Sequence, residues 1–250
     1  MNARTFFLAC AALLLGAIAA IAQEYSPSGA PASWTPPVND AKPLSFFQVD
    51  RSEIQLGRGD NIYLWDTQGW YGNDKDKFWV KAEGEGAFGG QFGQAEFQGL
   101  WSRMITPFFD FQAGVRQDIG PGPSPTYAVI GLQGLAQYWF EVDSALFLSD
   151  DGDLTARIEA EYEMLFTQRL IGQPRLEANF AAQDVPGLGI GSGLSTIEAG
   201  YRLRYEVRRE FAPYIGVAWQ SAVGDTKGFR RALGEQVAST SFVAGIRLWF

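Results

Sequence analysis

The chain has no histidine, and its 250 residues include one cysteine and three methionines. Without an imidazole, a Ser–His or Asp–His hydrolase lacks its general base. The cysteine, Cys10, lies in an N-terminal segment that we expect to be cleaved off, so the mature chain has no disulfide, thiolate ligand or thiol nucleophile. Carboxylates occur along every predicted strand, so no pair stands out for acid–base catalysis. The sequence therefore predicts a protein that is not an enzyme.

Long apolar runs are also missing, apart from one at the N-terminus. Residues 1–22 are typical of a secretory signal peptide, with Arg4 as the basic residue, an apolar stretch over 6–19 and the small-residue cleavage site Ala20-Ile-Ala22. The apolar stretch is shorter than the roughly 20 residues that a membrane-spanning helix needs. We therefore predict a signal peptide over 1–22 and no transmembrane helix elsewhere.

The charge balance is acidic. After removal of the signal peptide, 19 basic residues (20 less Arg4) stand against 28 acidic ones, a net charge of −9. Such a chain is a poor partner for nucleic acid, whose binding needs a basic surface. The 29 glycines and the many aromatic residues suit tight turns and the aromatic belts found at membrane interfaces.

From residue 77 onward, the sequence consists of strand-length segments with a period of two. In 197–207, for example, Ile197, Ala199 and Tyr201 alternate with Glu198 and Arg202. Glycine- or proline-rich connections alternate with tight ones, as in outer-membrane β-barrels, which have long outer loops and short periplasmic turns. Ten strands are predicted, near residues 77–85, 94–104, 107–117, 126–135, 138–148, 154–165, 171–181, 195–207, 210–219 and 241–250.

The region before residue 77 divides into two parts. Residues 23–60 contain five prolines among small and polar residues, which predicts a proline-rich periplasmic arm that is mostly disordered. Residues 61–76 are either a periplasmic cap or an extra strand, and the latter implies twelve strands. The overall prediction is an all-β, antiparallel transmembrane β-barrel over 77–250, with about ten strands and twelve as the alternative. Its location is the outer membrane of a Gram-negative bacterium, with the arm in the periplasm.

The last segment resembles the closing strand of such a barrel. Its apolar side chains point to one face, which has to meet the outer-membrane lipid. We predict that this strand is the assembly signal read by the outer-membrane barrel assembly machinery, and that the signal comprises Phe242, Ile246, Leu248 and Phe250.

The opposite faces of the strands carry charges that point into the lumen. Glu159, Glu161 and Glu163 form the densest acidic row, and like charges so placed repel unless bases lie opposite; Arg202, Arg204 and Arg208 are the candidates. Acids outnumber bases on this face, so the lumen favours cations. Mutual neutralisation and transient binding of a hard cation both remain open. The predicted lumen charge network comprises Glu83, Glu85, Glu96, Arg157, Glu159, Glu161, Glu163, Glu198, Arg202, Arg204 and Glu206.

Several short stretches occur together in the order in which a known family has them. They are Trp70-Tyr-Gly72, Lys81-Ala-Glu-Gly-Glu85, Gly114-Val-Arg116, Gly131-Leu-Gln-Gly-Leu-Ala136, Tyr138-Trp-Phe-Glu141, Leu165-Phe-Thr-Gln-Arg-Leu170, Gln173-Pro-Arg175, Tyr201-Arg-Leu-Arg-Tyr-Glu206, Arg209-Glu-Phe-Ala-Pro-Tyr-Ile-Gly216 and Gly245-Ile-Arg-Leu-Trp-Phe250. In these the chain resembles the copper resistance protein B family, from about residue 60 to 250.

The resemblance implies an outer-membrane barrel that supports copper tolerance beside a periplasmic multicopper oxidase, with the copper ion as a possible ligand. Members of the family typically have an arm rich in methionine and histidine, whereas residues 27–60 of this chain contain neither. Met104 and Met164 are the methionines left after cleavage, too far apart in sequence for a thioether site. No metal-binding residue is therefore assigned.

Three hypotheses follow for the function. The first is a copper resistance barrel that acts by export or sequestration of the metal. The second is a passive, narrow, cation-favouring porin-like channel. The third is a structural anchor that holds a periplasmic partner through the arm.

Overall fold

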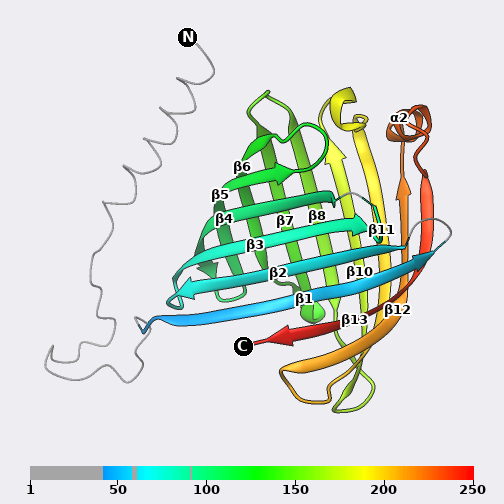
Figure 1. The fold of residues 1–250 in the computed structure, drawn as a ribbon. Helices are drawn as coiled ribbons and strands as arrows, with labels where there is room; N and C mark the ends of the chain where they lie inside the picture. The colour runs from blue at the N-terminus through cyan, green and yellow to red at the C-terminus, as the bar shows by residue number, and fades with distance from the viewer. Residues whose placement is uncertain (1–41, 58–60, 91) are drawn as a thin grey trace, which may run out of the picture. The chain divides into compact units, whose positions relative to one another are not determined.

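The computed structural model describes residues 42–57, 61–90 and 92–250, and these form an antiparallel β-barrel with few helices (Figure 1). No helix within these ranges is long and apolar enough to cross a membrane. The strands are β1 (Leu44–Gly57), β2 (Ile62–Gly72), β3 (Asp76–Ala87), β4 (Phe92–Thr106), β5 (Phe109–Ile119), β6 (Thr126–Leu135), β7 (Phe140–Ser149), β8 (Leu154–Tyr162), β9 (Met164–Leu165), β10 (Leu170–Ala181), β11 (Gly193–Tyr205), β12 (Phe211–Ala222) and β13 (Ala238–Trp249).

Neighbouring strands pair in sequence order, and the ring closes between the first and the last. Ile54 of β1 lies opposite Ala244 of β13. The two-residue β9 continues the line of β8 beyond Glu163, and both strands pair with β10. The barrel is thus closed by twelve strands plus the short β9. The predicted count of about ten was too low, and the twelve-strand alternative is the correct one.

Strand β1 corrects the predicted extent of the arm, because residues 44–57 belong to the barrel. The sequence hides this strand because it contains a β-bulge, which puts two residues opposite one and reverses the alternation. The pairing with β2 shifts between Val49 and Arg51, so that Gln48 and Arg51, three residues apart, are both buried. The residues 61–76 include strand β2, as the extra-strand alternative predicts. The predicted signal peptide and the arm up to residue 41 lie outside the described residues.

The two faces of the barrel wall have opposite chemistry. Apolar side chains point outward, as shown by Phe242 and Ile215, which are 73% and 65% exposed. Polar side chains such as Arg51, Gln112 and Arg202 are buried inside. This is the reverse of a water-soluble fold and the arrangement expected of a barrel in lipid.

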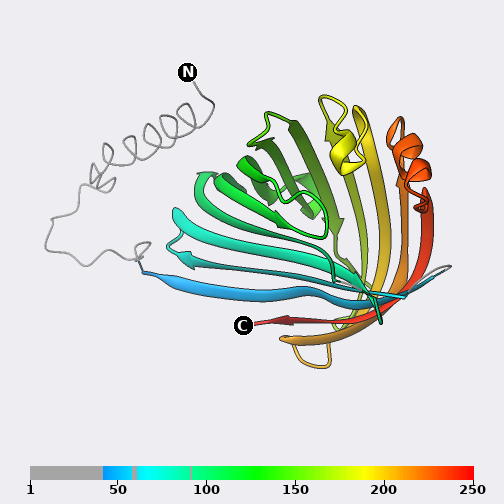
Figure 2. The same ribbon diagram turned by 45° about the horizontal axis from the view of Figure 1, so that its top comes forward.

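The two ends of the barrel differ in their connections. The long loops contain the 3-10 helix η2 (Pro186–Leu188) and helix α2 (Thr226–Ala232), which lie beside one another at one end (Figure 2). They are tied together where the backbone N–H of Gly191 donates to Oγ1 of Thr226 at 2.9 Å. We call this the loop end. The opposite, short-turn end has connections such as residues 73–75 and the 3-10 helix η1 (Gln137–Trp139).

One side of the interior is filled with apolar and aromatic side chains. Trp79, Leu100, Tyr127, Val129 and Phe147 form this buried cluster, on strands β3, β4, β6 and β7. The guanidinium of Arg116 lies over it, 5.1 Å from the ring centroid of Tyr127 and 4.7 Å from that of Phe147, within the range of a cation–π contact. The cluster narrows the interior and supports the charged groups described below.

Gly245 of β13 allows a close approach that side chains would block. A Cβ at this position would lie 2.6 Å from the carbonyl oxygen of Ser52 and 2.6 Å from Oη of Tyr214. Gly245→Ala is therefore expected to destabilise the barrel by about 1–3 kcal/mol, as overpacking does. The measurement is urea-induced unfolding from lipid vesicles. In the control Gly228→Ala, a Cβ would meet nothing within 4 Å, so unfolding should be unchanged or slightly harder.

Candidate functional site

The centre of the barrel holds three arginines that each contact carboxylates from several strands. Arg51 of β1 is the first, and its side chain is 2% exposed. Its Nη2 lies 3.0 Å from Oδ2 of Asp66 and 2.7 Å from Oε1 of Glu83, and its Nη1 lies 3.6 Å from Oε1 of Glu198. Arg51 thus joins β1 to β2, β3 and β11.

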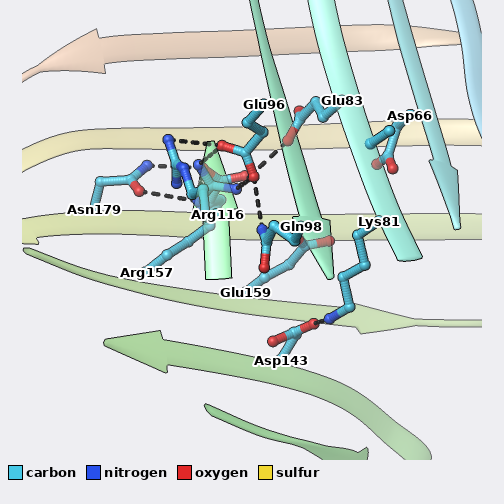
Figure 3. Close-up of polar contacts among 12 residues, drawn as sticks. Asp66, Lys81, Glu83, Glu96, Gln98, Arg116, Asp143, Arg157, Glu159 and Asn179 are labelled. Atoms are coloured by element: carbon cyan, nitrogen blue, oxygen red, sulfur yellow. Dashed lines mark hydrogen bonds and ion pairs between the residues drawn. The ribbon is translucent and has the colours of Figure 1, made fainter. Parts of the chain in front are cut away.

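Arg157 of β8 reaches across to the other side of the barrel. Its Nη1 and Nη2 donate to the two oxygens of Glu96 on β4, at 3.1 and 2.9 Å (Figure 3). Its Nη1 also lies 3.5 Å from Glu83, and its Nε lies 3.6 Å from Glu177 of β10. Two hydrogen bonds to one carboxylate are the strong arrangement of an arginine pair.

Arg175 of β10 contacts four carboxylates. Its Nη2 lies 2.7 Å from Oε2 of Glu159 and 2.6 Å from Oε2 of Glu177. Its Nε lies 3.3 Å from Oε1 of Glu161, and its Nη1 lies 3.0 Å from Oε1 of Glu198. Glu159 and Glu161 belong to the acidic row of β8. Arg175 therefore relieves much of the repulsion within that row.

Six of these residues form a closed cycle of alternating charge, which we call the central ring. It runs Arg51–Glu83–Arg157–Glu177–Arg175–Glu198 and back to Arg51. Its Glu83–Arg157 contact joins β3 to β8, which are separated by four strands along the shorter arc of the barrel. The ring therefore crosses the interior rather than following the wall.

A second cluster lies beside the ring and is more deeply buried. The Glu53 side chain is 0% exposed and accepts hydrogen bonds from Nε and Nη2 of Arg202, both at 3.0 Å. Oη of Tyr214 donates to the same carboxylate at 3.1 Å. These three residues join β1, β11 and β12 over the backbone of β13.

Further ion pairs lie toward the short-turn end. Glu163 is contacted by Arg204 at 2.6 Å and by Arg247 at 3.2 Å, and Arg247 also pairs with Asp50 at 3.0 Å. Lys81 pairs with Asp143 (Figure 3). Lys77 pairs with Asp110 at 2.7 Å. The pair Arg247–Asp50 joins the neighbouring strands β13 and β1, whereas the other contacts join parts of the wall that are not neighbours and so bridge the interior.

The residues of the predicted charge network all come from the described barrel, and most lie in these contacts. Arg204 meets Glu163 as expected, whereas Arg202 pairs with Glu53 and Arg208 lies exposed in the turn after β11. Two predicted members are peripheral: Glu206 lies 3.9 Å from Arg204, and Glu85 accepts a 3.5 Å hydrogen bond from Gln94.

Arg175, Glu177 and Arg247 lie on counted strands but are not in the predicted network. Sequence reasoning did not place five further charged residues in the interior, and four of these lie on the two strands that were not counted. They are Asp50, Arg51, Glu53, Asp66 and Lys77. The signal that could have found them is the return of period-two alternation after the bulge, where Glu53 and Gln55 alternate with Ile54 and Leu56.

The predicted closing-strand residues lie on β13 and at its end. Phe242 points outward, and Ile246 and Leu248 share its side of the strand. Phe250 exchanges two backbone hydrogen bonds with Phe47 of β1, at 2.8 and 3.1 Å, and its side chain is exposed. The last residue thus takes part in closing the barrel between β1 and β13.

Two cavities occupy the interior on the short-turn side of the ring. The larger, of about 540 Å³, is lined by eight acidic and three basic residues. The acids are Asp50, Asp66, Glu83, Glu96, Glu141, Asp143, Glu159 and Glu161, and the bases are Lys81, Arg157 and Arg247. The smaller, of about 300 Å³, shares Gln48 and Arg247 with it. Within the described part of the chain, no group of three or more histidine, cysteine or acidic residues is arranged to hold a metal ion.

A closed antiparallel barrel with an apolar exterior and a charged interior defines a porin-like β-barrel. Among solved structures, the NanC porin is similar in fold, with a TM-score of 0.54 at 9% sequence identity, covering 81% of this chain and 98% of the porin. The KdgM porin gives a TM-score of 0.49 at 13% identity, covering 82% of this chain and 98% of that one.

Sequence comparison identifies the family. The model of the family described as "Copper resistance protein B precursor (CopB)" matches residues 44–250. Copper resistance protein B of Escherichia coli is 44% identical over 202 residues, which are 81% of this chain and 68% of that protein. A copper resistance protein B homolog of Pseudomonas syringae pv. tomato is 42% identical over 213 residues, which are 85% of this chain and 72% of that protein. The chain therefore belongs to the copper resistance protein B family.

Proposed function

We propose that this protein is a non-enzymatic outer-membrane barrel of a copper resistance system and supports copper tolerance by export or sequestration of the metal. The observation that carries the proposal is the family match, which extends over the barrel from β1 to the last residue of the chain. It includes the strands that bring Arg51, Glu53 and Asp66 into the interior. The charged interior thus lies within the part of the chain that defines the family.

The outer face supports the membrane part of the proposal. Exposed aliphatic and aromatic side chains cover strands around the whole barrel, for example Val80, Ile130, Leu176, Ile215 and Phe242. A water-soluble protein rarely exposes such a large continuous apolar surface. We propose that lipid of the outer membrane covers this face, and that the barrel assembly machinery inserts it through the β13 end.

The interior supports a role with cations. The larger cavity has five more acidic than basic residues in its lining, which favours cations over anions. Glu141 is exposed at the cavity, near the short-turn end. We propose that this cavity gathers copper ions by weak carboxylate contacts rather than in a fixed coordination site.

Growth on copper tests the proposal directly. A strain without this gene is expected to lose growth on copper while its growth on zinc and cadmium is unchanged, and the intact gene should restore it. Equal growth of the two strains on copper would rule out a role in copper tolerance.

The cavity is tested by a single substitution. Glu141→Gln is expected to lower copper tolerance in the complemented strain without lowering the amount of folded barrel, because one exposed carboxylate of the cavity loses its charge. Glu210→Gln, which changes an exposed carboxylate in the turn before β12, is the matched control and should have no effect. An equal response of the two variants would argue against the cavity.

The two alternative functions make different predictions. A passive cation channel requires steady current in a planar bilayer, and the ion pairs across the interior argue against it. The anchor hypothesis, with a multicopper oxidase as the proposed periplasmic partner, is tested by deleting the arm. Because β1 begins at Leu44, that deletion has to stop at about residue 40 so that the barrel stays whole.

A further inference from the structure

We propose that the central ring is a closed gate, and that in this state the two cavities are reached from the short-turn end alone. The inference rests on the membrane-barrel part of the proposed function and adds a barrier of defined position. It assigns Arg51, Arg157 and Arg175 as the residues that hold the barrier together.

The first support is the path of the ring across the barrel. Its contacts connect β1 and β3 on one side with β8, β10 and β11 on the other. Beside the ring, the aromatic side chains of Trp79, Tyr127 and Phe147 narrow the interior. Arg116 and Arg157 both lie over the ring of Phe147, at 4.7 and 5.8 Å, so the charged and aromatic parts are in contact. Together they reach across the interior, with the ring joining β1 and β3 to β8, β10 and β11 and the cluster lying on β3, β4, β6 and β7.

The second support is the burial of half of the ring. The side chains of Arg51 and Arg175 are each 2% exposed, and that of Glu177 is 10% exposed. The other three are 21–29% exposed, and of these Glu83 and Arg157 line the larger cavity. A water-filled passage through the ring would leave Arg51, Arg175 and Glu177 more exposed.

The third support is the position of the cavities. The larger one is lined by Glu83 and Arg157 of the ring and by Pro107, Phe108 and Leu135 at the short-turn end. Neither cavity includes a lining residue from the loops that contain η2 and α2. The cavities therefore form a vestibule that ends at the ring.

The ring is redundant, which determines how it has to be broken. The partners of Arg157 and Glu83 have other contacts: Glu96, outside the ring, also pairs with Arg116 at 2.8 Å, Glu177 also pairs with Arg175, and Arg51 also pairs with Asp66. The double variant Arg157→Gln with Glu83→Gln therefore removes the crossing between β3 and β8 while each remaining ring charge keeps a partner. The matched control is Lys77→Gln with Asp110→Gln, which removes one ion pair outside the ring.

Access is measured with single cysteines, since the mature chain has none of its own. Gln68→Cys places a thiol in the vestibule, and Gln94→Cys places an exposed thiol beside Glu85 at the loop end. The full mature chain is reconstituted into sealed vesicles, and a small charged methanethiosulfonate is added outside. Labelling is normalised to that in detergent, where both ends are open.

In a sealed vesicle, each barrel exposes either its loop end or its short-turn end to the reagent outside. A closed barrel is therefore reached from that one end. The labelled fractions of the two probes are then expected to be complementary and to add up to the whole population. In the ring variant both probes should be labelled almost completely, because the reagent passes through. The control pair should behave like the unaltered barrel.

Two results would overturn the proposal: complete labelling of both probes in the unaltered barrel, or complementary labelling that persists in the ring variant. If the ring variant fails to fold, the unaltered barrel still decides whether the interior is closed. Failure of the chain to float with the vesicles would instead contradict the membrane-barrel proposal, so the two failures are distinguishable.

Discussion

Replacing Arg202 by alanine is expected to destabilise the barrel by about 3–5 kcal/mol, because it leaves a buried carboxylate without its cation. Glu53 is fully buried and receives two hydrogen bonds from Arg202. After the substitution, Glu53 keeps the hydrogen bonds that Oη of Tyr214 and Nε2 of Gln55 donate, at 3.1 and 2.9 Å, and neutral donors do not compensate a buried charge. Urea-induced unfolding from lipid vesicles measures the loss.

Two further variants separate charge from packing. Glu53→Leu combined with Arg202→Met removes both charges and is expected to recover most of the stability, since apolar pairs often replace buried ion pairs without loss. Arg103→Ala breaks an exposed pair with Asp76 at 3.9 Å and should change stability by less than about 1 kcal/mol. Equal losses for Arg202→Ala and Arg103→Ala would mean that Glu53 is not buried as described.

An arginine on the outer face is expected to have the second large effect. Ile158 lies in the middle of β8, is 48% exposed and points away from the interior. Ile158→Arg should destabilise the membrane-inserted barrel by about 2–4 kcal/mol, as a charge near the middle of the bilayer does.

The same substitution outside the lipid-facing band provides the control. Leu233 follows α2 at the loop end and is 65% exposed. Leu233→Arg is expected to leave unfolding from vesicles almost unchanged, because water already surrounds that position. A similar loss for both variants would contradict the placement of Ile158 against lipid.

The sequence predicts the face of each residue well, because alternation along a strand is a local property. Since Glu159 is predicted to point inward, period two puts its neighbour Ile158 outside, and the structure agrees. The same reasoning found the ten segments that became β3 to β13. It failed at β1, where the bulge between Val49 and Arg51 reverses the alternation and the charges around it resemble a polar arm.

Most partners across the interior were beyond sequence reasoning, because they depend on the number of strands and their tilt. Arg202, Arg204 and Arg208 were expected opposite Glu159, Glu161 and Glu163. Arg204 does contact Glu163, but Arg175 contacts Glu159 and Glu161, and Arg202 pairs with Glu53 on a strand that had not been counted. Two additional strands change which residues face one another, even when every face is assigned correctly.

The seam between β1 and β13 has a consequence for how the polypeptide reaches its final state. Ile54 pairs with Ala244, 190 positions later, so this hydrogen-bonded ladder has the largest entropic barrier to formation. Until these hydrogen bonds form, β1 and β13 each have an unpaired edge that can pair wrongly with other chains. We expect kinetic traps and aggregation to originate at this seam, and substitutions there to slow maturation more than they weaken the finished protein.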